Sequence, residues 1–207
     1  MKRLIIGISG ASGVIYGIRM LEVLKELGDV ETHLIMSKFG RLNIDIETNH
    51  SIDYVESLAD VVHGHANQAA TISSGSFRTD GMVIAPCSMN TLSAIAHSAA
   101  ENLLVRAADV VLKERRPLVL MPREVPMHVG HCKLLYEVAQ LGAVIAPPMP
   151  AFYNQPKTID DLINHSVGRV LDLFGIDTGA VKRWAGSLKS TGADTARANV
   201  SEMKEHK

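Results

Sequence analysis

A short apolar segment at the start of the chain runs directly into a glycine-rich loop and then into a helical pattern. Residues 2–6 are mostly apolar, as in a buried strand, and residues 14–27 place apolar side chains on one helical face. Between them, residues 7–13 read Gly-Ile-Ser-Gly-Ala-Ser-Gly. A strand, a tight turn and a helix form the first half of a βαβ unit, so this junction favours an α/β fold.

The glycine-rich loop also predicts chemistry, because it lies at a helix N-terminus. Unpaired N–H groups and the positive end of the helix dipole converge there, which suits an anion such as a phosphate. Gly7, Gly10 and Gly13 would let the backbone approach a ligand closely. The spacing is neither a dinucleotide fingerprint nor a P-loop. We therefore expect a nucleotide phosphate here, with a plain strand-to-helix turn as the alternative.

The alternation of strand and helix patterns continues along the chain. Strand-like runs recur at residues 31–36, 81–86, 117–121 and 143–146, and helical patterns at 89–99, 103–113, 129–141 and 158–174. Thr158 and Asp161 have the spacing of a capping box, and residues 67–80 are typical of a loop. The pattern predicts a parallel sheet with helices on both faces, in a single domain over residues 1–184, followed by a polar, flexible tail over 185–207.

Composition excludes several classes of function. A formal net charge of −1 provides no basic field for nucleic acid or an anionic membrane. No apolar run approaches the roughly 20 residues of a membrane span, and two cysteines make no disulfide framework, so we expect a cytoplasmic protein. The nine histidines form no recognisable ligand set, and we expect no metal site. Cys87, after a buried strand, is expected to be a core residue.

Ligands of parallel sheets bind beyond the carboxyl ends of the strands, so the loops there are the candidate site. Ser37 and Ser88 each follow a strand, although a helix cap is the simpler interpretation of Ser88. Arg123 and Glu124 lie between two prolines that restrict the backbone. The Arg123 guanidinium could bind a phosphate with two hydrogen bonds, and Glu124 beside a cation could move protons.

Three further cations lie on predicted helices. Arg106 and Lys113 are seven residues apart and can share a helical face, and Arg169 lies off the apolar stripe of its helix, together with His165 and Ser166. Each is either part of a solvated helix face or a ligand contact, and spacing alone leaves both interpretations open.

Several of these segments, in this order, resemble the flavin prenyltransferases of the UbiX type, including those associated with phenolic-acid decarboxylases. The resemblance covers residues 1–184 and rests on segments 7–13, 36–37, 74–82, 86–92, 106–110, 122–124 and 152–153. It implies a flavodoxin-like or Rossmann-like α/β fold and a homododecamer. It also implies transfer of the dimethylallyl group of dimethylallyl phosphate to N5 and C6 of reduced FMN, without a metal. The product is the cofactor of a UbiD-type decarboxylase.

The resemblance also implies roles for individual residues. Ser12 and Glu124 would assist proton movement, and Arg106 would act across a subunit boundary. The implied FMN contacts are Gly10, Ala11, Ser12, Ser37, Ser88, Met89, Asn90, Thr91, Arg106 and Arg123. The implied contacts to dimethylallyl phosphate are Lys113, Arg123, Tyr153, Arg169 and Trp184. The chain departs from the family at 132–134, where Cys-Lys-Leu replaces a frequent Leu-Glu-Asn, and this affects expected interface contacts.

Two other functions fit a flavin-binding fold. One is an FMN-dependent cysteine decarboxylase, for which His63 or His65 would be the candidate base. The other is a non-catalytic decarboxylase subunit that only binds flavin. Loss of Glu124 or of the phosphate-binding cations would favour these alternatives, and the sequence keeps all of them.

Overall fold

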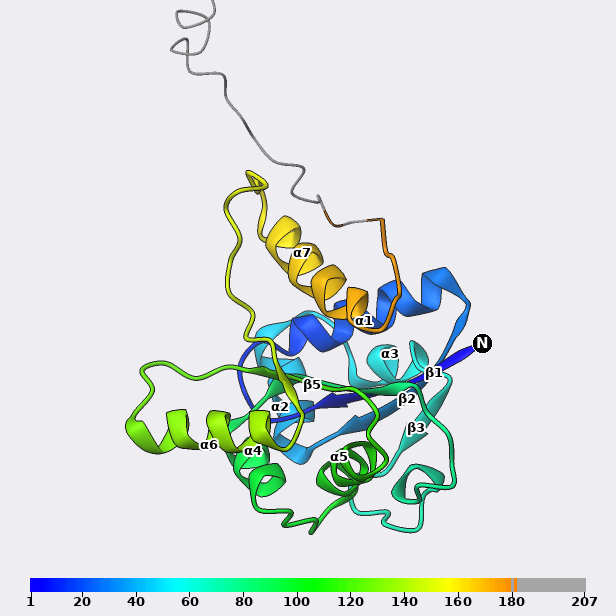
Figure 1. Cartoon of the computed structure of the whole chain (residues 1–207). Coiled ribbons are helices and arrows are strands. Elements are labelled where there is room, and N and C mark those ends of the chain that lie inside the picture. The colour runs from blue at the N-terminus through cyan, green and yellow to red at the C-terminus, as the bar shows by residue number, and fades with distance from the viewer. Residues whose placement is uncertain (180, 182–207) are drawn as a thin grey trace, which may run out of the picture.

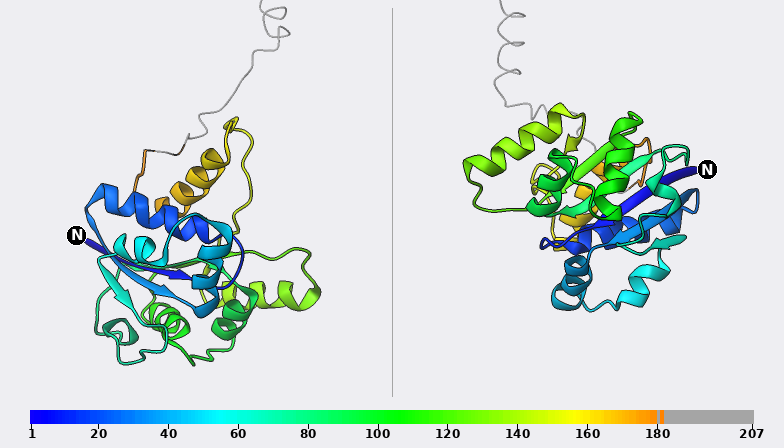
Figure 2. Two further views of the ribbon diagram at one scale, coloured as in Figure 1. Left: turned by 180° about the vertical axis from the view of Figure 1, so that it is seen from behind. Right: turned by 90° about the horizontal axis from the view of Figure 1, so that it is seen from below.

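The computed structural model describes residues 1–179 and 181, in which a six-stranded parallel sheet lies between two layers of helices (Figures 1 and 2). The strands are β1 (Lys2–Ile8), β2 (Val30–Met36), β3 (Val61–His63), β4 (Gly81–Cys87), β5 (Leu118–Pro122) and β6 (Val144–Ile145). The helices are α1 (Val14–Leu27), α2 (Lys38–Glu47), α3 (Ile52–Ser57), α4 (Met89–Ala96), α5 (Leu103–Lys113), α6 (Val129–Gln140) and α7 (Ile159–Asp172). The predicted fold class is confirmed.

The sheet has the strand order β3-β2-β1-β4-β5-β6, and all neighbouring strands are parallel. The chain first adds strands on one side of β1 and then crosses to the other side with β4. The order therefore reverses between β1 and β4, which in doubly wound sheets is the place where ligands bind. The loops after β1 and β4 lie side by side at this point.

Two hydrophobic cores fill the space between the sheet and its helices. Helices α1, α3 and α7 lie on one face, and α4, α5 and α6 lie on the other (Figure 1). Alternate residues of β1 supply both cores, with Ile6 in the first and Ile5 in the second. Each of these side chains is almost fully buried, which stabilises the fold by about 1.5–3 kcal/mol per aliphatic residue.

The boundaries of α1 match the prediction, and two glycines explain why. Gly13 precedes the helix at φ 104° and Gly28 ends it at φ 68°, conformations that residues with a Cβ rarely adopt. The capping box of Thr158 and Asp161 at the start of α7 is also confirmed. The predicted loop over 67–80 contains one short 3₁₀ turn, Thr71–Ser73.

The sequence did not predict α2, α3 or β3, and placed the end of α4 too late. Most large apolar residues of α2 do not point to the core: Phe39, Leu42 and Ile46 are exposed, and only Ile44 among them is buried. Strand β3 has three residues, too few for a period to be visible. Helix α4 ends at Ala96 because Ser98 takes a φ of 52°.

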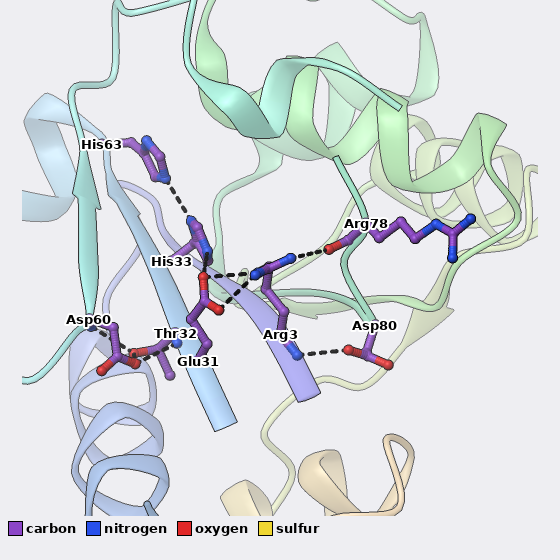
Figure 3. Close-up of polar contacts among 8 residues, drawn as sticks. All are labelled: Arg3, Glu31, Thr32, His33, Asp60, His63, Arg78 and Asp80. Atoms are coloured by element: carbon purple, nitrogen blue, oxygen red, sulfur yellow. Dashed lines mark hydrogen bonds and ion pairs between the residues drawn. The ribbon is translucent and has the colours of Figure 1, made fainter. Parts of the chain in front are cut away.

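A chain of polar side chains crosses the sheet from β1 to β3 (Figure 3). Arg3 donates two hydrogen bonds to Glu31, of 2.9 and 2.8 Å, and Glu31 Oε1 lies 2.9 Å from His33 Nε2. His33 Nδ1 in turn lies 2.9 Å from Nε2 of His63 at the end of β3. The Arg3 guanidinium lowers the pKa of Glu31 to about 2, so this carboxylate stays charged. This series of polar side chains links three strands through hydrogen-bonded groups.

Candidate active site

The loops after β1 and β4 are fastened together by Ser9, which is buried where the strand order reverses. Its Oγ donates to the Pro86 carbonyl at 2.9 Å and accepts from the Ser88 backbone N–H at 2.7 Å. The Ser9 N–H also donates to the Pro86 carbonyl, at 3.2 Å. These bonds fix the distance between two predicted binding loops before any ligand arrives.

The glycine-rich loop is held from the side by α2. Asn43 Nδ2 donates to the Ala11 carbonyl at 3.0 Å, and Glu47 Oε2 accepts from the N–H groups of Gly13 at 2.8 Å and Val14 at 3.2 Å. The expectation that these N–H groups are unpaired was therefore wrong, because the protein supplies its own anion there. The exposed residues Gly10 and Ser12 lie in the segment that these bonds hold in place.

The predicted hydroxyl groups after β2 and β4 are N-caps. Ser37 Oγ accepts from Gly40 N–H at 3.0 Å, and Ser88 Oγ accepts from Thr91 N–H at 3.2 Å, so the simpler interpretation of Ser88 is confirmed. The Thr91 hydroxyl lies 3.1 Å from Ser88 Oγ and is nearly buried. Met89 is half-buried and Asn90 is exposed. The capped helices α2 and α4 direct their N-termini to the ligand edge of the sheet.

Arg123 and Glu124 line a hollow of about 310 Å³ beyond the end of β5. Its other walls are mainly apolar, formed by Pro122, Val125, Met127, Leu135, Ile145 and Pro147–Met149. Within the part of the chain that the structure describes, the Arg123 guanidinium makes no hydrogen bond or ion pair, and Glu124 accepts only from Val125 N–H, at 3.1 Å. The hollow thus combines an apolar surface with an available cation and an available carboxylate.

A second hollow, of about 240 Å³, shares Pro147 and Met149 with the first. It is lined by Arg169, His165 and Ser166 of α7. Arg169 is exposed and pairs with Asp172 at 2.7 Å, while Tyr153 Oη lies 3.2 Å from His165 Nε2. Arg123, Glu124, Tyr153 and Arg169 therefore lie at one edge of the sheet, around two adjoining hollows.

Two predicted cations are engaged by other groups of the same chain. Lys113 ends α5, next to the start of β5, whereas Glu124 follows the end of β5. A five-residue strand spans roughly 16 Å, so Lys113 is near the opposite edge of the sheet, where it pairs with Glu114. Arg106 pairs with Asp109 at 2.8 Å and donates to the Ser73 carbonyl. Trp184 lies outside the described residues. One chain thus assembles only part of the predicted site.

Comparison with known proteins gives consistent matches. The sequence model of a family described as Flavoprotein matches residues 1–170. The chain is 57% identical over 189 residues to the flavin prenyltransferase UbiX of Escherichia coli (strain K12), covering 90% of this chain and all of that protein. The chain belongs to the UbiX flavin prenyltransferases.

Solved structures of the same family agree. AnUbiX (PadA1), solved in complex with FMN and dimethylallyl pyrophosphate, is 49% identical with a TM-score of 0.88 over 90% of this chain and 98% of that one. A dodecameric FMN-dependent UbiX-like decarboxylase from Escherichia coli O157:H7 is 51% identical with a TM-score of 0.87, over 89% of this chain and all of that one. This family membership favours the prenyltransferase expectation over the two alternatives.

Sequence reasoning did not single out three residues around the site. Asn43 and Glu47 lie on α2, a helix that the apolar pattern did not reveal. His165 was named only as a neighbour of Arg169, with a solvated helix face and a ligand contact both left open, and it is 6% exposed. Its proximity in sequence to Arg169, one helical turn away, was the available signal.

Cys87, His63 and His65, the side chains considered as a nucleophile or a base, are buried or half-buried in the fold. Cys87 is fully buried in the second core, which confirms the expectation, and burial raises the pKa of its thiol. Burial lowers the pKa of both His63 and His65. Among the described residues, no three His, Cys, Asp or Glu side chains gather as a metal site. None of the described helices is long and apolar enough to span a membrane.

Proposed function

We propose that this chain transfers the dimethylallyl group of dimethylallyl phosphate to reduced FMN. The allylic C–O bond breaks, inorganic phosphate leaves, and new bonds form at flavin N5 and C6 with loss of a proton from each position. The observation that carries the proposal is the placement of Arg123 and Glu124 in an apolar hollow at the same edge of the sheet as the glycine-rich loop. Membership of the flavin prenyltransferases supports it.

The residues present fit an FMN molecule along the ligand edge. A phosphate needs cationic or N–H donors, and the N-termini of α2 and α4, with Ser37, Ser88 and Thr91, supply hydroxyls and helix dipoles. Since Glu47 occupies the N-terminus of α1, we assign the phosphate to the neighbouring donors and give Gly10, Ala11 and Ser12 the role of backbone contacts. Arg123, whose guanidinium has no partner among the described residues, provides a further cation. Met89 and Asn90 would also line the FMN site. Reduced FMN, when bound, supplies the nucleophilic atoms.

Arg123 and Arg169 would hold the phosphate of the prenyl substrate, together with Tyr153. As the C–O bond breaks, negative charge grows on the leaving phosphate, and fixed guanidinium groups stabilise that charge more strongly than mobile water does. Glu124 would accept the two protons released at the flavin and return one to the leaving phosphate and one to the alkene, with Ser12 as a relay. The apolar walls would keep water from the allylic cation.

We further propose that a neighbouring copy completes each site within a homododecamer. Lys113 lies away from Glu124 in one chain, so its predicted contact requires a second subunit, and Arg106 is proposed to act across the same subunit boundary. Large apolar side chains next to the hollows, including Val125, Met149 and Phe152, are exposed in the single chain, as expected of surfaces that another subunit covers. A solved relative is dodecameric. Trp184 is proposed to help close the site.

The remaining parts of the proposal concern the setting of the reaction. The proposed site consists of arginines, a lysine, hydroxyls and one carboxylate, so we propose a metal-independent transfer. We also propose that the protein acts in the cytoplasm. The prenylated FMN would be delivered to a UbiD-type decarboxylase that acts on an aromatic acid. A chelator such as EDTA is expected to leave the rate unchanged.

The direct test is anaerobic incubation of the purified protein with FMN, a reductant and dimethylallyl phosphate, followed by mass spectrometry of the extracted flavin. The proposal predicts a flavin heavier by one five-carbon unit and stoichiometric release of phosphate. An unchanged flavin mass would contradict it.

A further inference from the structure

His165 has surroundings unlike those of a solvated helix residue. It lies in α7 one turn before Arg169, is 6% exposed, and lines the second hollow together with Arg169 and Ser166. Its Nε2 lies 3.2 Å from Tyr153 Oη, and the two rings meet edge to face at 81° with centroids 5.6 Å apart. The imidazole thus lies against the hydroxyl of Tyr153, a residue predicted to bind the substrate.

The other ring nitrogen identifies the tautomer. His165 Nδ1 is buried, and no hydrogen-bond partner reaches it within the described residues. A buried N–H without an acceptor is rarer and more costly than a buried lone pair without a donor. The neutral ring therefore carries its proton on Nε2 and donates it to Tyr153 Oη. In this arrangement the imidazole does not accept the phenolic proton and does not compete with a phosphate oxygen for it.

Burial and the charge of Arg169 both favour the neutral form of His165. Burial is the largest cause of its lowered pKa, and the positive charge of Arg169 acts in the same direction, while Asp172 opposes it. Arg19 of α1, which packs against α7, is engaged by Asn164 and Asp160 on the same helix. A neutral imidazole adds no charge to the hollow and leaves Arg169 as its cation.

We infer that His165 is a positioning residue that orients the Tyr153 hydroxyl toward the phosphate of the prenyl substrate beside Arg169. This inference rests on the proposed function, since it gives the second hollow a phosphate-bearing ligand. It adds a residue that acts through Tyr153 and does not itself contact the ligand.

Calorimetric titration of dimethylallyl phosphate into the protein loaded with oxidised FMN tests the inference without turnover. His165→Phe keeps a ring in the same space but removes the donor, and should raise the Kd about fivefold, the effect of one neutral hydrogen bond. Tyr153→Phe should raise it at least as much. In the Tyr153→Phe background, His165→Phe should add less than about twofold, because the two residues act as one unit. His165→Gln, which retains an N–H donor, should restore binding close to wild type.

Two results would overturn the inference: an unchanged Kd for His165→Phe, or effects of the two substitutions that multiply. If His165→Phe fails to fold, the adaptable His165→Met takes its place in the same cycle. His50, whose ring stacks on Tyr54 away from the hollows, provides the matched control, and His50→Phe should leave the Kd unchanged. Failure of the proposed function is separate, because it appears as an unmodified flavin in the wild-type reaction under reducing conditions.

Discussion

Two arginine–glutamate combinations in this molecule have opposite surroundings. Arg3 and Glu31 bind each other through two hydrogen bonds, and Glu31 also contacts His33 (Figure 3). Arg123 and Glu124 are adjacent in sequence but make no such pair, and both line a hollow at the ligand edge of the sheet. The charges of Arg3 and Glu31 neutralise each other within the fold, whereas those of Arg123 and Glu124 remain available to a ligand.

The difference separates charges that stabilise the fold from charges that act on a ligand. Arg123 is exposed, so water solvates its charge and the missing partner costs little free energy. A phosphate group could therefore bind Arg123 without first breaking an ion pair. Arg116 belongs to the first class, because it donates to the carbonyls of Gly75 and Phe77 and holds the loop between β3 and β4.

Lys113 tests this separation most severely, because it pairs with Glu114 in one chain yet is proposed to act on a neighbour's substrate. Exposed pairs of this kind are weak, so the lysine can change partner. Lys113→Ala and Glu124→Gln should each lower product formation by at least about 100-fold. Subunits of the two variants, dissociated and reassembled in equal amounts, should recover activity, because random mixing gives about a quarter of the sites both wild-type residues. No recovery would place both residues in the same subunit's site.

Substitution of Arg169 should give the next largest effect, on substrate binding. Removing the guanidinium by Arg169→Ala should weaken binding of dimethylallyl phosphate by about 1.5–3 kcal/mol, the value of a charged hydrogen-bonding partner. FMN affinity should stay the same. The control is Lys133→Ala, which removes an exposed cation paired with Glu137 on α6. Equal substrate affinity in the wild type and Arg169→Ala would remove this residue from the site.

Glu47 combines features of both classes of charge. Its carboxylate is bound by backbone N–H groups of the fold, and these bonds hold a predicted binding loop. Glu47→Ala removes the cap of α1 and should lower the free energy of unfolding by about 1 kcal/mol. It should also weaken FMN binding, measured by fluorescence titration, since residues 10–13 lose their support. Asp45→Ala, at an exposed position of the same helix, should change neither quantity. Unaltered FMN binding by Glu47→Ala would limit its role to stability.

The pH dependence of stability is the smallest expected effect. His63, His65 and His165 have pKa values lowered from 6.5 by burial, so the unfolded chain binds protons that the folded chain does not. Stability should therefore decline as pH falls below about 6.5. Glu31, with a pKa of about 2, adds a second decline as pH falls below 4.5. Urea midpoints measured from pH 8 to pH 4 would show this, and a midpoint that rises between pH 7 and pH 5 would contradict it.

The sequence predicted the parts whose cause is local. Helix α1 begins and ends at glycines with positive φ, and strands β1 and β4 are continuous apolar runs, so both are visible in the pattern. Helix α2 was not predicted because most of its large apolar residues are exposed, and Glu47 was missed with it. The strand-end loops were predicted. The position of Lys113, at the other edge of the sheet from Glu124, depends on the tertiary arrangement, which residue spacing does not reveal.

The central claim is that Arg123 and Glu124, which do not pair with each other at the ligand edge, act in the chemistry, whereas the Arg3–Glu31 pair holds the fold. It is tested most directly by removing one carboxylate charge from each class and measuring both stability and product formation. Glu31→Gln should lower the free energy of unfolding by about 1–2 kcal/mol, with the folded protein still active. Glu124→Gln should keep FMN bound and stability unchanged while product formation falls by at least about 100-fold. Wild-type product formation by Glu124→Gln, or an inactive but fully stable Glu31→Gln, would contradict the account.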